Sequence, residues 1–186
     1  PELLYLLLLW LFQVISAQGN FPPGPPFPNI PQKCLGPPPA VENPHECCQI
    51  PPFFSDEDFA ECGFQKLGDG ADASQRRGPP DCSKQLCMLK KYELLQDDET
   101  IDVEAISKFL DDWAEKNEEF QPAAEAAKDR CIGKQLFGPP QICEANKLVF
   151  CVSSTIFDKC PTWQENEGCK ELRTRMDECR PHFPSK

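Results

Sequence analysis

The sequence predicts an all-α protein, a disulfide-stapled bundle of about six short helices with a Pro-rich N-terminal arm and an extra C-terminal helix. Three observations lead to this prediction. The chain from Ser55 onward has the apolar periodicity of helices. It contains 12 cysteines, an even number suited to a disulfide framework. Twelve of its prolines lie between Asn20 and Phe54, where they exclude regular helix or sheet.

Residues 1–17 have the form of a secretory signal peptide. Leu3 to Val14 is an apolar run too short to span a bilayer comfortably, and small residues up to Ala17 follow it. Because the chain starts at Pro1 without a basic segment, we expect this signal peptide to be N-terminally incomplete. All the cysteines come after it, so we expect an oxidising, extracellular compartment and disulfides.

Residues 18–54 form the predicted arm. Their prolines favour an extended, polyproline-like chain. Cys34, Cys47 and Cys48 give this arm three attachment points. The arm therefore has two interpretations: a recognition segment centred on Phe21 to Phe27, or a covalently tethered arm packed on the domain. The tethers favour the second.

Residues 55–186 form the predicted helical domain, and each helix has a local signal. Ser55 can cap the first helix, and Thr100 or Asp102 can cap the third, whose apolar residues recur at helical spacing. Pro122 suits a first helical turn. The expected segments are Ser55 to Gln65, Asp81 to Leu95, Asp102 to Asn117, Pro122 to Cys131, Pro140 to Cys160 and Trp163 to Cys179, with a polar loop from Gly68 to Gly78.

The charge and the motifs of the chain argue against nucleic-acid binding, membrane binding and catalysis. The formal net charge of -11 argues against a nucleic-acid or membrane surface. His45 and His182 lie in proline-rich segments, where we expect them to be exposed, and no nucleophile, zinc or phosphate-loop motif is present. We therefore predict no enzyme activity, no catalytic residues, no cofactor and no metal.

The spacing of Cys131, Cys143, Cys151 and Cys160, with Pro161 directly after Cys160, resembles that of the insect odorant-binding proteins. The extra cysteines at both ends and the Cys160-Pro161 pair resemble the Plus-C subclass. The family pattern then implies bridges from Cys62 to Cys87, from Cys82 to Cys151 and from Cys131 to Cys160. The resemblance covers roughly residues 62–179.

One departure from the family is visible. Four residues, not three, separate Cys82 from Cys87, and five positions on a regular helix point about 140° apart. Either that helix is irregular or the partners of these cysteines approach from different sides. If the family bridges hold, an odd number of arm cysteines remains, so at least one of Cys34, Cys47 and Cys48 must pair with Cys143, Cys169 or Cys179.

The resemblance implies a secreted carrier of small hydrophobic ligands, odorants or similar semiochemicals, found in sensillum lymph or haemolymph. Such a carrier would bind its ligand non-covalently in an internal apolar cavity, and a membrane odorant receptor is a further implied partner. We expect a monomer or weak homodimer and weaker binding in acid. The candidate lining residues are Phe109, Leu110, Trp113, Leu148, Phe150, Val152, Ile156, Phe157 and Met176. For each of them ordinary core is the favoured alternative, because every helix must bury such residues.

Two other functions compete with a carrier. One is a disulfide-rich protein-interaction or inhibitor module that acts through the Pro-rich arm. The other is a helical lipid-binding protein of the saposin kind, but its usual three-bridge hairpin and glycosylation site are missing here.

Overall fold

The computed structural model describes residues 30–35, 44–64, 82–136, 138 and 140–182. The chain divides into two compact units, Pro1–Gly36 and Pro37–Lys186, and each is described by itself. In the first unit, α2 (Gln32–Leu35) is a short helical turn. The predicted signal peptide, the segment from Phe21 to Phe27 and the polar loop from Gly68 to Gly78 lie outside the described residues.

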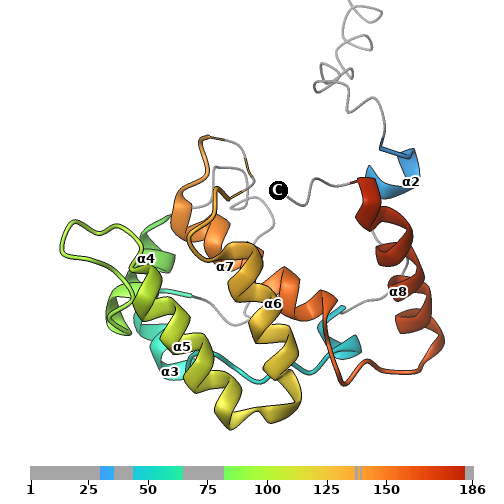
Figure 1. Cartoon of the computed structure of the whole chain (residues 1–186), viewed down its shortest axis with the longest axis horizontal. Helices are drawn as coiled ribbons and strands as arrows, with labels where there is room; N and C mark the ends of the chain where they lie inside the picture. The colour runs from blue at the N-terminus through green and yellow to red at the C-terminus, as the bar shows by residue number, and fades with distance from the viewer. Residues whose placement is uncertain (1–29, 36–43, 65–81, 137, 139, 183–186) are drawn as a thin grey trace, which may run out of the picture. The chain divides into compact units, whose positions relative to one another are not determined.

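The described part of the second unit is helical, which confirms the predicted all-α, disulfide-stapled bundle (Figure 1). Among the described residues of this unit, the β structure is limited to an isolated β-bridge between Leu95 and Ile101. The elements are η2 (Pro44–Cys47), α3 (Asp56–Glu61), α4 (Cys82–Lys91), α5 (Val103–Lys116), η4 (Glu118–Phe120), α6 (Gln121–Cys131), α7 (Glu144–Asp158), α8 (Glu167–Cys179) and η5 (Arg180–His182).

Local caps start the helices as the sequence predicts. The side chain of Ser55 accepts a hydrogen bond from the Asp58 amide, and that of Asp102, rather than Thr100, accepts one from the Ala105 amide. Pro122 lies in the first turn of α6. Such caps satisfy amide groups that the helix itself leaves without acceptors.

Some predicted boundaries were wrong. The helix α4 ends at Lys91, because Glu93 adopts a positive φ of 56° and turns the chain toward the Leu95 bridge. The helix α7 starts at Glu144 instead of near Pro140. The arm is not extended throughout, since Pro44 begins the 3-10 helix η2. Proline is compatible with a first helical turn, where its missing N–H group is not needed.

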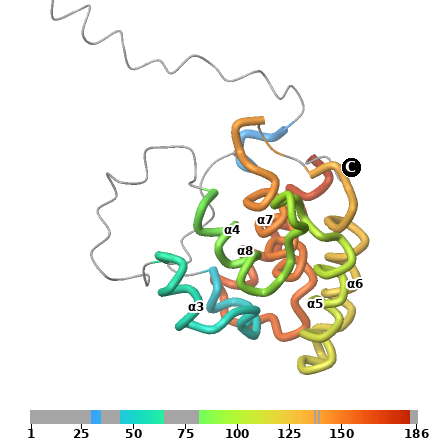
Figure 2. Tube along the Cα trace, turned by 90° about the vertical axis from the view of Figure 1, so that its left-hand side faces the viewer, coloured from blue at the N-terminus to red at the C-terminus, as the bar shows by residue number. Residues whose placement is uncertain are grey.

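The main core lies between α5, α6 and α7. Figures 1 and 2 both show α5 and α6 side by side. Ala123, Ala124 and Ala127 are buried on α6, and these small side chains let α5 and α7 approach it closely. Phe120, which is 0% exposed, fills the end of the core and lies edge-on to Trp113 at 5.6 Å between ring centroids.

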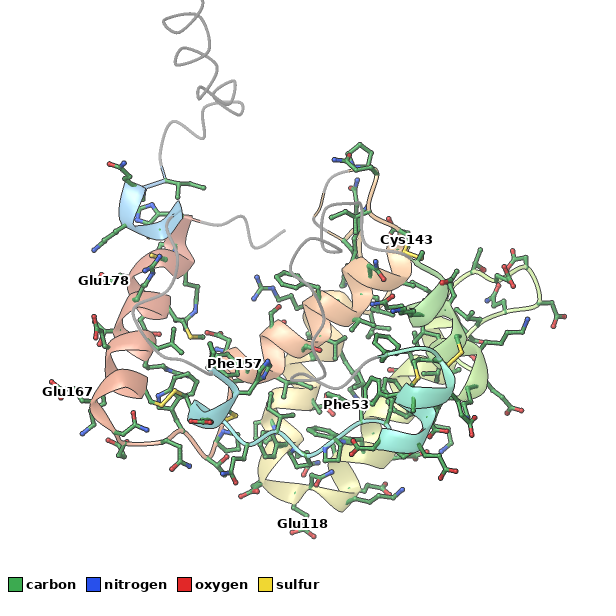
Figure 3. The ribbon with its side chains drawn as sticks, turned by 180° about the vertical axis from the view of Figure 1, so that it is seen from behind. Phe53, Glu118, Cys143, Phe157, Glu167 and Glu178 are labelled. Carbon is green, nitrogen blue, oxygen red and sulfur yellow. A yellow bond between two sulfur atoms is a disulfide. The ribbon has the colours of Figure 1, made fainter. Side chains whose placement is uncertain are left out.

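Disulfides from Cys47 and Cys48 tie the arm to the C-terminal half. Cys47 pairs with Cys169 across 122 residues, and Cys48 pairs with Cys160 across 112 residues. The prediction that at least one arm cysteine bridges to Cys143, Cys169 or Cys179 is therefore confirmed. Figure 3 shows the arm segment, defined here as residues 44–54, running from the Phe157 end of α7 toward α3.

The pairing implied by the family pattern is only partly correct. The bridge between Cys62 and Cys87 is confirmed. Cys82, however, pairs with Cys143 instead of Cys151, and Cys131 pairs with Cys151 instead of Cys160, which takes Cys48 from the arm. No described cysteine is free.

The length of α7 explains these corrections. Cys143 precedes its first turn and Cys151 lies about two turns further along, so their Cα atoms are about 12 Å apart along the axis. A disulfide needs Cα atoms within about 7 Å, so each cysteine pairs with a different neighbouring helix. Of the two explanations for the Cys82–Cys87 spacing, the second therefore holds: α4 is α-helical over both positions and their partners come from different elements.

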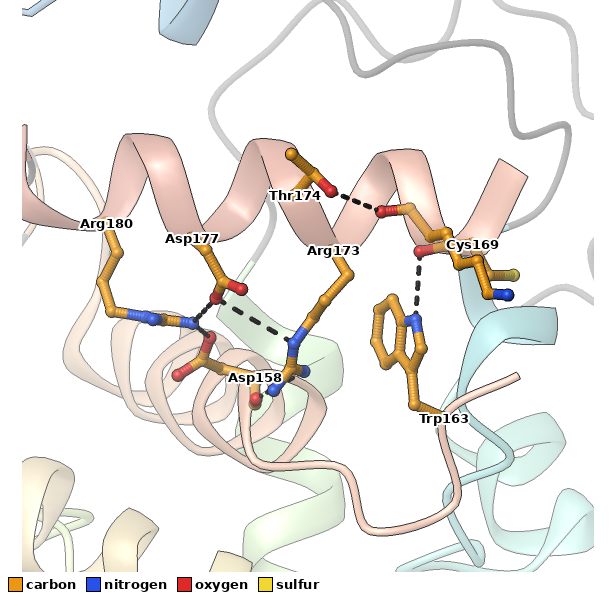
Figure 4. Close-up of polar contacts among 8 residues, drawn as sticks. Asp158, Trp163, Cys169, Arg173, Thr174, Asp177 and Arg180 are labelled. Carbon is orange, nitrogen blue, oxygen red and sulfur yellow. Dashed lines mark hydrogen bonds and ion pairs between the residues drawn. The ribbon is translucent and has the colours of Figure 1, made fainter. Parts of the chain in front are cut away.

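Polar contacts hold the last helix to the end of α7 (Figure 4), and the Cys47–Cys169 bridge holds it to the arm. Arg180 pairs with the Asp158 carboxylate at 2.5 Å, and Arg173 donates to the Asp158 backbone carbonyl at 2.9 Å. The Trp163 indole N–H donates to the Cys169 carbonyl at 3.0 Å. These contacts fix α8 against the segment that follows α7.

Two phenylalanines provide a matched test of this core. Phe120→Ala should lower the free energy of unfolding by about 3 to 5 kcal/mol, because it leaves a cavity in a packed site. Phe150→Ala should change it by no more than about 0.5 kcal/mol, because Phe150 is 73% exposed. Urea unfolding of both oxidised variants measures the difference, and equal losses would contradict the burial described here.

Removing one arm bridge should cost less than its long loop suggests. In Cys48→Ser with Cys160→Ser, the Cys47–Cys169 bridge still closes the long loop, and only a ring of about ten residues opens. We expect the free energy of unfolding to fall by about 3 kcal/mol, because the unfolded chain gains entropy when the ring opens. Urea unfolding measures this change. Cys131→Ser with Cys151→Ser, a bridge of separation 20, should lose a similar amount and serves as the control. Global unfolding of the first variant alone would contradict this prediction.

Candidate functional site

A pocket of about 320 Å³ lies between the arm segment and helices α4, α5 and α7. Its walls are almost entirely apolar; among the lining side chains only His45, Gln85 and Ser153 are polar. The pocket is partly open to solvent, and a fully enclosed cavity stays a prediction.

Helical periodicity explains which side chains reach the pocket. Each of the three helices contributes residues from one face, spaced three or four positions apart. These residues are Gln85, Met88 and Leu89 from α4, Ile106, Phe109 and Leu110 from α5, and Leu148, Val149, Val152 and Ser153 from α7. The remaining wall comes mainly from the arm segment, from Ile50 to Phe54, and from Phe59, Phe64 and Leu94.

Aromatic contacts hold the arm segment in place over the helices. Phe53 stacks on Trp113 with ring centroids 4.5 Å apart, and Phe54 stacks on Phe109 at 5.5 Å. Phe54 also contacts Tyr92 edge-on at 4.8 Å. Offset-stacked and edge-on rings each add about 0.5 to 1.5 kcal/mol beyond the area they bury. The arm segment is therefore part of the core and not a loose cover.

A charged cluster joins α3 to the end of α4 beside these rings. The Asp58 carboxylate accepts hydrogen bonds from Tyr92 at 2.5 Å and Ser55 at 2.6 Å, and pairs with Lys91 at 2.6 Å. Lys91 also contacts Glu61. The hydrogen bond from Lys91, followed by those from Ser55 and Tyr92, holds the Asp58 pKa far below its usual range. The hydrogen bonds of Lys91 to Asp58 and then to Glu61 raise the Lys91 pKa.

A second pocket, of about 450 Å³, lies on the other side of Leu148. Leu86, Val103 and Ala145 line this second pocket from the same three helices that line the first. Leu148 is 3% exposed and contributes to both pockets. Its side chain therefore forms part of the partition between them.

The structure places four of the nine predicted lining residues at the first pocket: Phe109, Leu110, Leu148 and Val152. Trp113 and Ile156 are buried in the main core, outside the pocket lining. Phe157 packs edge-on against Trp163 at 5.1 Å, and Met176 packs against the cluster around Cys169. Phe150 is exposed, because it lies two positions from Leu148 and Val152 and so points away from their face.

Sequence reasoning missed the arm's contribution and Gln85. A signal for Phe54 was present: it directly precedes the cap Ser55, and Phe59 occupies the fourth helical position. This is the pattern of a hydrophobic staple, and the two rings meet edge-on at 5.8 Å. No sequence signal distinguishes Gln85 from any other polar residue on a helix.

Other kinds of site find no support in the described part of the chain. It contains no cluster of potential metal ligands, and no helix in it is long and apolar enough to cross a membrane. His45 and His182 are both exposed, as predicted.

Comparison with known proteins supports the resemblance seen in the sequence. The chain is 22% identical over 189 residues to general odorant-binding protein 68 of Anopheles gambiae, covering 94% of this chain and 83% of that protein. It is 24% identical over 153 residues to general odorant-binding protein 67 of the same organism, covering 74% of each. No family model matches the chain. The chain is therefore homologous to these two odorant-binding proteins.

The low Asp58 pKa predicts how the stability of the protein depends on pH. A lowered folded pKa stabilises the protein above the unfolded value of about 3.9, and this contribution is lost only as the pH falls below that value. Asp58→Asn should therefore lower stability equally at pH 7 and pH 5, measured by urea unfolding. Asp112→Asn, whose carboxylate pairs only with exposed Lys108 among the described ion pairs, should change little. A deficit in Asp58→Asn that disappears at pH 5 would contradict this assignment.

Proposed function

We propose that this chain is a secreted carrier that binds small hydrophobic molecules, such as odorants or similar semiochemicals, without covalent chemistry. The observation that carries the proposal is the largely apolar pocket of about 320 Å³ lined by the arm segment and α4, α5 and α7. Homology to proteins named as odorant-binding proteins supports the same function. The volume lies at the lower end of the range for small-molecule sites, which favours small ligands.

Removal of apolar ligand surface from water is the proposed driving force. At about 25 cal/mol per Å², burial of about 330 Å² corresponds to the roughly 8 kcal/mol of micromolar affinity. Loss of the ligand's motional freedom opposes this gain. The aromatic rings of Phe53, Phe54 and Phe109 add little further ordering cost on binding, because the arm disulfides and mutual stacking already fix their positions.

Secretion, absence of enzyme activity and the Plus-C subclass are parts of the same proposal. The oxidised cysteines fit an extracellular compartment. The arm cysteines that pair with Cys160 and Cys169 fit a subclass defined by extra cysteines at both ends. A membrane odorant receptor as partner, the monomer or weak homodimer and weaker binding in acid stay predictions. Asp58 stays ionised in mild acid, so it would not cause such weakening.

The alternative of a protein-interaction module rests on Phe21 to Phe27, outside the described residues. Removing residues 18–29 leaves every cysteine in place and separates the two functions. A carrier should keep its small-ligand uptake after this deletion. An interaction module should lose its activity.

Uptake and displacement of the fluorescent probe N-phenylnaphthylamine test the carrier function directly. The oxidised protein without its predicted signal peptide should take up the probe at micromolar concentration, and small apolar volatiles should displace it. Reduction of the disulfides should abolish uptake, because the arm segment would no longer be held over the pocket. A correctly oxidised protein that takes up no probe would contradict the proposal.

Neighbouring serines on α7 locate the binding site. Ser153→Trp should reduce probe uptake at least tenfold, because Ser153 lines the pocket and an indole there would occupy it. Ser154→Trp is the matched control, since Ser154 is also exposed but does not line the pocket. Both variants should unfold at similar urea concentrations. Equal uptake by the two variants would place the ligand elsewhere.

A further inference from the structure

Gln85 lines the largely apolar pocket and has a side-chain polar atom without a hydrogen-bond partner. It lies on α4 between Cys82 and Cys87, both of which are bridged, and shares a face with Met88 and Leu89. Its side-chain oxygen Oε1 is buried and has no hydrogen-bond partner. The other polar lining residues, His45 and Ser153, are exposed. Gln85 is half-buried as a residue, but its Oε1 is covered from solvent.

A buried acceptor without a donor is unusual and unfavourable, because it loses its hydrogen bonds to water and gains none. Small-molecule sites commonly combine an apolar wall with a few polar groups that orient the ligand. A ligand hydroxyl is the donor that a lone carboxamide oxygen lacks. Its chain would then extend along the apolar walls formed by α5 and the arm segment.

We propose that Gln85 accepts a hydrogen bond from the hydroxyl group of the bound ligand, so that this pocket prefers small apolar alcohols to analogues without a donor. The inference rests on the proposed carrier function and names the ligand class of the same pocket. Oε1 is covered in the empty pocket, so contact requires rotation of the terminal amide. The energy profile of that torsion is broad.

The test compares an alcohol with its methyl ether, since only the alcohol can donate. Decanol and decyl methyl ether compete with N-phenylnaphthylamine for the oxidised protein. The wild type should bind decanol about fivefold more tightly than the ether, the gain typical of one net hydrogen bond. Gln85→Met keeps the length of the side chain but removes its polar atoms. This variant should lose the preference because its affinity for decanol falls while its affinity for the ether is unchanged.

Gln141→Met is the matched control, because Gln141 is exposed and does not line the pocket. It should keep the wild-type preference. Gln85→Met should be at least as stable as the wild type in urea, because an unpartnered buried acceptor has been removed. A purely structural glutamine would instead lose stability without a change in ligand preference.

The outcomes separate this inference from the proposed function. If the wild type binds both ligands equally, or prefers the ether, the assignment of Gln85 as acceptor is overturned while the carrier function stands. A preference for decanol that survives in Gln85→Met also overturns it, and Gln85→Leu repeats the comparison if the first variant does not fold. If the wild type takes up no probe and neither competitor binds, the carrier function itself fails.

Discussion

The covalent attachment of the arm segment at adjacent cysteines is the constraint on which the rest of the site depends. Cys47 and Cys48 point to different partners, Cys169 at the start of α8 and Cys160 just after α7. The arm segment is thereby fixed at both ends of the loop that joins α7 to α8. The prolines and phenylalanines that follow are then held against α5. Without these bridges the pocket would lack the wall formed by Ile50 to Phe54.

The disulfides also explain why the domain can contain unfilled apolar space. Empty volume in a core forfeits dispersion contacts and lowers stability, so most proteins fill it. In this chain, both cysteines of α4 are cross-linked: Cys87 is bridged to Cys62, and Cys82 is bridged to Cys143. Cross-links restrict the unfolded chain and so supply stability that does not depend on tight packing. The helices α4, α5 and α7 can therefore line pockets on both sides of Leu148.

Charge and polarity are distributed so that the pocket stays apolar. The ion pairs of Asp58, Lys91 and Glu61 lie where α3 meets the end of α4, and the aromatic rings of Phe54 and Tyr92 lie beside them. The strongly lowered Asp58 pKa means that this junction keeps its charges well into the acidic range. Among the polar lining residues, Gln85 is the one whose side-chain oxygen is buried without a hydrogen-bond partner, and the proposed ligand preference rests on that oxygen.

The sequence by itself determined the helical class, the cap at Ser55 and, because the arm has three cysteines, the need for at least one bridge that leaves the arm when all cysteines are oxidised. Caps and apolar periodicity are interactions within a few residues, and parity of cysteines is a matter of counting. Only the tertiary structure decided that Cys82 pairs with Cys143, that Phe150 faces solvent, and that Phe53, Phe54 and Gln85 line the pocket. A helix as apolar as α7 does not show which of its faces meets which neighbour. That choice depends on packing between segments distant in the sequence, and both the disulfide pairing and the pocket follow from it.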